Sequence, residues 1–317
     1  MKLGILGAGA FGTALALVYS GKFDVTLFSC FKDHVDSMNA SRINAYFSDF
    51  KIPKDVTIKV TSDLNRDEFN CLLWAFPIKP TSQILESISG KVNGTVTIIC
   101  AKGLLNDGTF MSDRFKKMLP DSKIGYIAGP NFAIDLAKGT LSAADIVFEK
   151  SSDADFYAET LSTETFKLYP SRDLVGSQIC GAIKNIAAIA CGIVNGLTNS
   201  QNTQATLLTY ALEEMKSLGK QLGAEEKTFY GLCGLGDLML TAFNETSRNF
   251  SLGLKLARGE KIDETIANSK AACEGYDTAK QIIKLAENNN VEMPICNRVY
   301  KVLFENSNPD IILDVFA

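Results

Sequence analysis

The glycine-rich segment near the N-terminus is the feature that most restricts the folds available to this chain. Residues Gly7 to Gly12 read G-x-G-x-x-G, and they separate an apolar strand at Lys2–Leu6 from a helix that we expect from Thr13 to Ser20. Glycines in this context permit a tight turn and close approach of the backbone to a pyrophosphate, while the helix N-terminus attracts the anion. The segment therefore predicts a dinucleotide-binding α/β domain.

The same N-terminal stretch also has the charge and hydropathy of a secretory signal, since Lys2 is followed by apolar residues as far as Tyr19. Because the glycines divide it into a strand, a turn and a helix, we assign it to the fold.

Further apolar runs alternate with helical segments along the first half of the chain. We expect strands at Asp24–Phe28, Leu72–Phe76, Val96–Ala101, Lys123–Ala128, Ala144–Phe148 and Phe166–Tyr169. Short continuous apolar runs of this kind are typical of buried parallel strands. The sequence thus predicts an N-terminal Rossmann domain over residues 1–172, in which a doubly wound sheet binds the dinucleotide.

The residues after the second predicted strand bear on the choice of coenzyme. An acidic residue at this point usually binds the ribose hydroxyls of NAD and repels the 2′-phosphate of NADP. Here Ser29, Cys30, Phe31 and Lys32 follow instead. We therefore expect NADPH to be accepted, with Ser29 and Lys32 available to its phosphate. The alternative for Lys32 is an ordinary solvated loop charge.

A second feature is the near absence of charge from Leu174 to Leu212, where Lys184 is the only charged residue. At 21% charged residues, about eight would be expected in a segment of this length, so the segment must be largely buried. Apolar residues recur around Lys184 with helical spacing. The lysine either extends to the surface or is desolvated with a lowered pKa, which suits proton transfer near neutral pH.

Beyond Asp173 the periodicity is helical throughout, which predicts an all-helical domain over residues 173–317. Asp237 lies among glycines and leucines, so we expect it to pair with Lys184, with a ligand, or with both. Ser247 is predicted to cap a helix that runs to Ala257. That cap places Arg248 and Asn249 at the positive end of the helix dipole, which predicts an anion site; an ordinary capped helix with an exposed arginine is the alternative.

Composition excludes several other classes of function. A net charge of −4 argues against nucleic acid as a partner. The eight cysteines include no C-x-x-C pair and mostly lie in apolar surroundings, so we expect reduced thiols in the cytoplasm and no metal site. The single histidine, His34, is expected at the surface. No membrane span is expected, because the uninterrupted apolar run from Ile186 to Val194 is less than half of the about 20 residues needed.

These motifs together resemble the bacterial NAD(P)-dependent glycerol-3-phosphate dehydrogenase family over nearly the whole chain. The resemblance lies in Gly7 to Gly12, Ala101-Lys102-Gly103, Gly129 to Ala133, Gly181 to Asn185, Gly234 to Leu238, Ser247-Arg248-Asn249 and Glu274-Gly275. It implies a cytoplasmic oxidoreductase that reversibly reduces dihydroxyacetone phosphate to sn-glycerol 3-phosphate with NAD(P)H and supplies glycerophospholipid synthesis. It leaves room for a homodimer, although the sequence does not determine the oligomeric state.

The resemblance also implies roles for individual residues. Lys184 is similar to the residue that donates and accepts the proton. The implied substrate contacts are Lys102, Gly129, Asn131, Lys184, Asp237, Ser247, Arg248 and Asn249. The implied coenzyme contacts are Gly7, Gly9, Ala10, Phe11, Gly12, Cys30, Lys32, Lys102, Ala133, Arg248, Ala272 and Glu274.

The chain departs from the family pattern at three places. Asn131 replaces a serine or threonine, Tyr210 replaces a common arginine, and Cys30-Phe31 replaces a basic or polar residue. Two other functions stay open at this point. A β-hydroxyacid dehydrogenase is disfavoured because Ala188, not asparagine, lies four residues after Lys184. A non-catalytic dinucleotide sensor would not need a buried lysine, an aspartate and an arginine in one site.

Overall fold

The computed structural model describes residues 1–267 and 273–316, which form two compact units. The first unit comprises Met1–Ala101, Met111–Ile127 and Asn131–Arg172. The second comprises Lys102–Phe110, Ala128–Pro130 and Asp173–Ala317. The short segments Lys102–Phe110 and Ala128–Pro130, which lie between stretches of the first unit in the sequence, therefore belong to the second unit.

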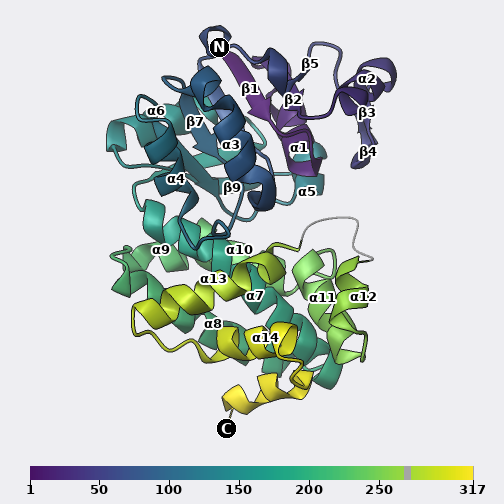
Figure 1. Ribbon diagram of the computed structural model, residues 1–317, viewed down its shortest axis with the longest axis vertical. Helices are drawn as coiled ribbons and strands as arrows, with labels where there is room; N and C mark the ends of the chain where they lie inside the picture. The colour runs from purple at the N-terminus through teal and green to yellow at the C-terminus, as the bar shows by residue number, and fades with distance from the viewer. Residues whose placement is uncertain (268–272, 317) are drawn as a thin grey trace. The chain divides into compact units, whose positions relative to one another are not determined.

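The first unit is built on an eight-stranded sheet, counted over the described residues, in the order β10-β9-β8-β7-β6-β1-β2-β5. Figure 1 labels strands β1, β2, β5, β7 and β9 of this sheet. Its strands are β1 (Lys2–Leu6), β2 (Asp24–Ser29), β5 (Thr57–Val60), β6 (Cys71–Trp74), β7 (Val96–Ile99), β8 (Ile124–Ala128), β9 (Ser142–Phe148) and β10 (Phe166–Ser171). Strand β1 is parallel to both β2 and β6, and the pairs β2–β5, β6–β7, β7–β8 and β9–β10 are also parallel. The order reverses beside β1, so the carboxyl ends of β1 and β6 form the switch point at which a Rossmann sheet binds its ligand.

The predicted strands are therefore confirmed, with boundaries that differ by at most two residues. Sequence reasoning missed β5 and the antiparallel hairpin formed by β3 (Ile43–Asn44) and β4 (Phe47–Lys51). Strand β5 is a short edge strand in which only Ile58 is buried, so it has no continuous apolar run to mark it.

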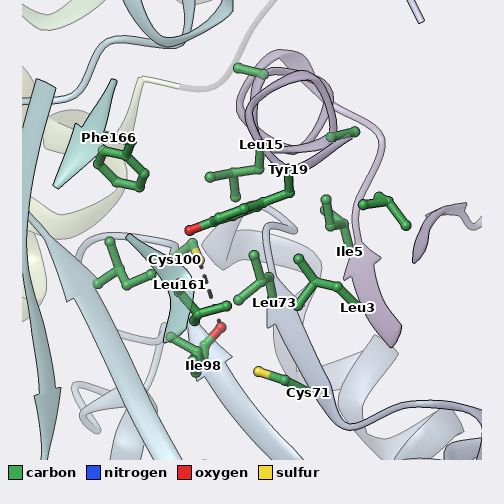
Figure 2. Packing of buried hydrophobic residues seen from close by; sticks show 14 of the residues in the cluster. Leu3, Ile5, Leu15, Tyr19, Cys71, Leu73, Ile98, Cys100, Leu161 and Phe166 are labelled. Atoms are coloured by element: carbon green, nitrogen blue, oxygen red, sulfur yellow. Dashed lines mark hydrogen bonds between the residues drawn. The ribbon is translucent and has the colours of Figure 1, made fainter. Parts of the chain in front are cut away.

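Helices cover both faces of this sheet, as the alternation of side chains along β6 requires. They are α1 (Ala10–Tyr19), α2 (Lys32–Ser41), α3 (Ile78–Val92), α4 (Met111–Met118), α5 (Ala133–Ala137) and α6 (Ser151–Leu161). Leu73 packs in one core cluster with Tyr19 of α1 and Leu161 of α6 (Figure 2). The neighbouring Trp74 instead meets Phe115 of α4 edge to face, at 4.8 Å between ring centroids. This is a doubly wound arrangement, as predicted.

The hydroxyl of Tyr19 offers a test of this core. The side chain is fully buried, and among residues 1–267 and 273–316 its oxygen has no hydrogen-bond partner. Burying an unpaired hydroxyl costs about 1–3 kcal/mol. We expect Tyr19→Phe to raise the free energy of unfolding by about 1 kcal/mol in urea titrations. The matched control is Tyr19→Leu, which removes the ring as well and should be destabilising; a loss of stability in Tyr19→Phe would contradict the prediction.

The second unit is organised around one long helix, α7 (Leu174–Thr198). It packs against α8 (Gln201–Gln221), α10 (Asp237–Ala242), α11 (Arg248–Ala257), α13 (Glu274–Asn288) and α14 (Pro294–Phe304). Shorter helices are α9 (Glu226–Tyr230) and α12 (Ile262–Ala267). No strand occurs in the described part of this unit from residue 173 onward, which confirms the all-helical prediction. By length and composition α7 could cross a membrane, but 89% of its apolar window is buried inside the protein, as in a core helix.

The start of α7 is held by Asp173. One carboxylate oxygen accepts a hydrogen bond from the Gly176 amide at 2.8 Å, which caps the helix. The other accepts from the Glu225 amide at 2.8 Å and from the Thr228 hydroxyl at 2.6 Å. The Asp173 carboxylate therefore also connects the start of α7 to α9.

Glycines bring α7 and α11 into close parallel contact. A Cβ atom at Gly192 would lie 2.1 Å from the Phe250 carbonyl oxygen, and one at Gly253 would lie 2.0 Å from the Ile189 carbonyl oxygen. One turn before these contacts, Asn185 of α7 is hydrogen-bonded to Asn249 of α11. The N-terminus of α11 therefore lies beside the middle of α7, where Lys184 is found.

Candidate active site

The centre of the candidate site is a buried cluster of one carboxylate and two lysines, all within the second unit. One oxygen of Asp237 lies 2.6 Å from the Lys184 Nζ atom, and the other lies 2.8 Å from the Lys102 Nζ atom. Asp237 is 1% exposed and Lys184 is 5% exposed. The expected pairing of Asp237 with Lys184 is thus confirmed, and Lys184 does not extend to the surface.

Each lysine also donates a hydrogen bond to a second group. Lys184 also donates to the Thr241 hydroxyl at 3.2 Å, one helical turn after Asp237 on α10. Lys102 donates to the Gly129 carbonyl oxygen at 3.0 Å. The segment before α10, Leu232–Gly236, is a π-helix, a form that is common at functional sites.

The electrostatics of the cluster favour a mobile proton on Lys184. Burial lowers the pKa of its ammonium group to about 8, although Asp237 pulls it up; Lys102 adds to the lowering. Burial alone would raise the pKa of the Asp237 carboxyl, but the two lysines together hold it below its usual value. At neutral pH the cluster therefore contains a carboxylate and a lysine that can give up its proton without a large free-energy cost.

A candidate anion site lies at the N-terminus of α11. Ser247 caps the helix as predicted, since its hydroxyl accepts a hydrogen bond from the Phe250 amide at 3.4 Å. Arg248 follows it, is exposed, and makes no hydrogen bond or ion pair with any residue that the structure describes. A capped helix start next to an uncommitted guanidinium is suited to a phosphate.

The Asn249 side chain has more hydrogen-bond partners within the protein than the sequence suggested. Its carbonyl oxygen accepts from the Gly275 amide at 2.9 Å and from the Cys273 thiol at 3.0 Å, and its amide nitrogen donates to Asn185 at 2.9 Å. Asn185 in turn donates to Glu274 of α13 at 3.1 Å. One amide hydrogen of Asn249 is thus already used, and the residue joins three helices in addition to any contact with a ligand.

The glycine-rich loop of the first unit has the shape that a dinucleotide requires. A Cβ atom at Gly12 would lie 1.9 Å from the Gly7 carbonyl oxygen, so only glycine allows α1 to start this close to β1. At Gly9, by contrast, an added Cβ would meet no atom of the described residues within 4 Å, its two neighbours in the chain aside. The backbone is therefore open to a ligand at Gly9, beside Ala10 and Phe11 at the start of α1. These residues fit a bound pyrophosphate.

The residues after β2 differ from the expectation. Ser29 is 3% exposed, and its hydroxyl lies 3.1 Å from the Nδ1 atom of His34. Cys30 is exposed, and Lys32 is an exposed residue that pairs with Asp36 at 3.1 Å. His34, which we expected at the surface, has a half-buried ring that packs between Ser29 and the buried Asn44.

The remaining predicted residues are spread over the chain. In the first unit Asn131 is buried and Ala133 begins α5. Ala272 lies outside the described residues. Sequence reasoning did not give roles to Thr241 and Asn185, although Asn185 adjoins Lys184 and Thr241 lies one helical turn after Asp237.

With this geometry established, both halves of the chain match models of known families. Residues 2–154 match the N-terminus of NAD-dependent glycerol-3-phosphate dehydrogenase, and residues 173–314 match its C-terminus. The chain belongs to the NAD-dependent glycerol-3-phosphate dehydrogenase family.

Similar proteins support this assignment along the whole length. A glycerol-3-phosphate dehydrogenase (NAD(P)+) of Maricaulis maris is 34% identical over 98% of this chain and 94% of its own length. One from Staphylococcus aureus is 36% identical over 96% and 94%, respectively. The crystal structure of glycerol-3-phosphate dehydrogenase from Coxiella burnetii is 30% identical and superimposes with a TM-score of 0.94, covering 99% of this chain and 98% of that one. The β-hydroxyacid dehydrogenase alternative is rejected.

Tyr210, which we expected to depart from the family pattern, has a local partner in this structure. The side chain is 44% exposed on α8, and its ring packs against Phe316 near the C-terminus at 6.0 Å between centroids. A tyrosine at this position therefore stabilises the C-terminal segment of this chain.

Proposed function

We propose that the protein catalyses the reversible reduction of dihydroxyacetone phosphate to sn-glycerol 3-phosphate with NADH or NADPH. The observation that supports this most directly is the buried Lys184–Asp237–Lys102 cluster beside the N-terminus of α11. Residues 1–172 form the coenzyme-binding domain and residues 173–317 the substrate-binding domain. The nicotinamide coenzyme supplies the hydride when it is bound.

Lys184 moves the proton in this reaction. Its ammonium group donates a proton to the carbonyl oxygen of dihydroxyacetone phosphate as that oxygen becomes an alkoxide, and its neutral amine accepts the proton in the reverse direction. Asp237 orients Lys184 and keeps it partly protonated. Lys102 offers a second positive charge to the same substrate, and Gly129 fixes the Lys102 side chain through its carbonyl oxygen.

The phosphate of the substrate binds at the start of α11. Ser247, Arg248 and Asn249 provide the capped helix start, the guanidinium and the remaining amide hydrogen. We also propose Asn131 as a substrate contact, as the family resemblance implies. The coenzyme contacts that we propose are Gly7, Gly9, Ala10, Phe11, Gly12, Cys30, Lys32, Lys102, Ala133, Arg248, Ala272 and Glu274.

We infer that the enzyme is cytoplasmic, acts as a homodimer and supplies glycerophospholipid synthesis. The first experiment measures oxidation of NADH and NADPH by the purified protein with dihydroxyacetone phosphate. We expect turnover that depends on the phosphate, so dihydroxyacetone at the same concentration serves as the matched control. No oxidation of either coenzyme would reject the proposal, and light scattering of the same sample tests the dimer.

The absence of an acid after β2 leads to a prediction about the coenzyme. We expect the unmodified protein to use NADPH with no strong preference for NADH. Ser29→Asp should lower kcat/KM for NADPH at least tenfold, because a carboxylate there repels the 2′-phosphate, and should leave NADH within about threefold. The isosteric control is Ser29→Asn, which adds the same bulk without charge. A preference of the unmodified protein for NADH by three orders of magnitude would contradict this account.

A further inference from the structure

His34, the single histidine of the sequence, belongs to a chain of hydrogen bonds that connects the glycine-rich loop to the carboxyl end of β2. At one end, Asn44 of β3 is 0% exposed and donates through Nδ2 to the Ala8 carbonyl oxygen in the glycine-rich loop at 2.9 Å. It also donates to the Thr13 hydroxyl at 2.6 Å. At the other end, Ser29 at the last position of β2 accepts from the Phe31 amide at 3.3 Å. His34 bridges Asn44 and Ser29.

The partners of Asn44 determine which nitrogen of His34 carries a proton. The Ala8 carbonyl can only accept and the Tyr46 amide, 3.0 Å from Oδ1, can only donate, so the orientation of the Asn44 amide is fixed. The His34 Nε2 atom lies 3.0 Å from the same Oδ1 and must therefore donate to it. In the neutral imidazole Nδ1 is then an acceptor.

The protonation state of His34 decides whether the Ser29 hydroxyl can donate a hydrogen bond to a ligand or can only accept one. When His34 is neutral, the only hydroxyl hydrogen of Ser29 points to Nδ1, and the oxygen can only accept further hydrogen bonds. When His34 is protonated, Nδ1 donates to the Ser29 oxygen, and the hydroxyl hydrogen is released to point elsewhere. Both states satisfy every partner in the chain of hydrogen bonds, and they differ by one proton and by the direction of one O–H bond.

The two states suit different coenzymes, because the carboxyl end of β2 is where a Rossmann fold meets the adenosine ribose. An acceptor suits a ribose 2′-hydroxyl, whereas a donor beside a positive imidazolium suits a 2′-phosphate. We propose that His34 is a specificity-determining residue, which favours NAD when neutral and NADP when protonated. This inference rests on the proposed use of NAD(P) by the enzyme.

Few charged side chains lie near the imidazole of His34. On its own helix α2 the neighbouring charges are Lys32, Asp33 and Asp36, of which Lys32 and Asp36 pair with each other. The β3–β4 hairpin carries the titratable residues Tyr46, Asp49 and Lys51, and of these Tyr46 meets the imidazole, edge to face at 5.3 Å between ring centroids. The two residues that hydrogen-bond to the imidazole, Ser29 of β2 and Asn44 of the hairpin, are neutral. Among the described residues no charged side chain hydrogen-bonds to His34.

The test compares binding of NAD+ and NADP+ by calorimetry at pH 8.5 and pH 6.0. We expect the affinity for NADP+ relative to NAD+ to rise about tenfold on going to pH 6.0. In His34→Asn, which keeps a polar group at the Nδ1 position, the ratio should change by less than about threefold. Titration of the 2′-phosphate itself occurs equally in both proteins and is removed by this comparison. An equal pH dependence in the two proteins would overturn the inference.

A second measurement uses the unmodified protein, so it does not depend on whether a variant folds. Because the chain has one histidine, its NMR spectrum contains one imidazole, whose 15N shifts identify the tautomer. We expect the Nε2–H form at high pH, and we expect NADP+ but not NAD+ to make the ring protonate at higher pH, as reciprocal linkage requires. The opposite tautomer, or no effect of NADP+, rejects the inference alone. If neither coenzyme binds, the proposed function fails as well.

Discussion

Lys184→Ala should lower kcat for dihydroxyacetone phosphate by a factor on the order of 10²–10⁴, which corresponds to about 3–5 kcal/mol of transition-state stabilisation. The reason is that Lys184 is the buried group with a mobile proton in the cluster. Coenzyme binding should stay near normal, since Lys184 is not among the coenzyme contacts that we propose. The fold should survive, because Asp237 retains its ion pair with Lys102 at 2.8 Å.

Two control variants separate proton transfer from charge. Lys184→Arg restores a positive charge that does not dissociate near neutral pH, so it should recover stability without recovering kcat. Lys184→Met preserves the length of the side chain and removes both the charge and the proton. If Lys184→Ala loses less than tenfold in kcat, Lys184 is only a structural lysine and another donor must exist.

The pH dependence of the two reaction directions provides an independent check. Burial lowers the pKa of Lys184 to about 8, so the lysine loses its proton as the pH rises through that value. Reduction of the carbonyl needs the protonated form, and its kcat should therefore fall above about pH 8. Oxidation of glycerol 3-phosphate needs the neutral amine, and its kcat should rise over the same range. Profiles that move in the same direction would contradict the assignment.

The parts of this site that could be predicted from sequence are those with a local cause. A lone charge in an apolar helix identified Lys184, and a lone acid among glycines identified Asp237, because burying either group unpaired is costly. The cap at Ser247 followed from residue type and position. The alternation of apolar runs and helices sufficed for the Rossmann sheet, apart from the short edge strand β5.

The parts that could not be predicted depend on side chains brought together from distant elements. Nothing near His34 in the sequence indicates that the β3–β4 hairpin will place Asn44 between it and the glycine-rich loop. In the same way, Asn249 looked like a free donor because its partners Asn185 and Gly275 come from two other helices. Hydrogen-bond partners of this kind are a property of the assembled fold, and no spacing rule along the chain anticipates them.

The second large effect is expected at Arg248. Charge-assisted hydrogen bonds to a phosphate are worth about 1.5–3 kcal/mol each, and a guanidinium can make two of them side by side. Lysine keeps the charge and loses this planar fork. Arg248→Lys should therefore raise KM for dihydroxyacetone phosphate at least tenfold, with a smaller effect on KM for the coenzyme. Steady-state kinetics with each substrate varied in turn measures both values.

The decisive comparison repeats these measurements with unphosphorylated dihydroxyacetone. Because Arg248 is exposed and makes no hydrogen bond or ion pair within the described structure, replacing it should disturb neither the fold nor the Lys184 cluster. The substitution should then have little effect on the weak turnover of the substrate that lacks a phosphate. Arg258, at the other end of α11, provides the control, since Arg258→Lys makes the same chemical change outside the proposed site. Equal losses on both substrates in Arg248→Lys would show that the arginine supports the fold or the coenzyme, and that the phosphate is bound elsewhere.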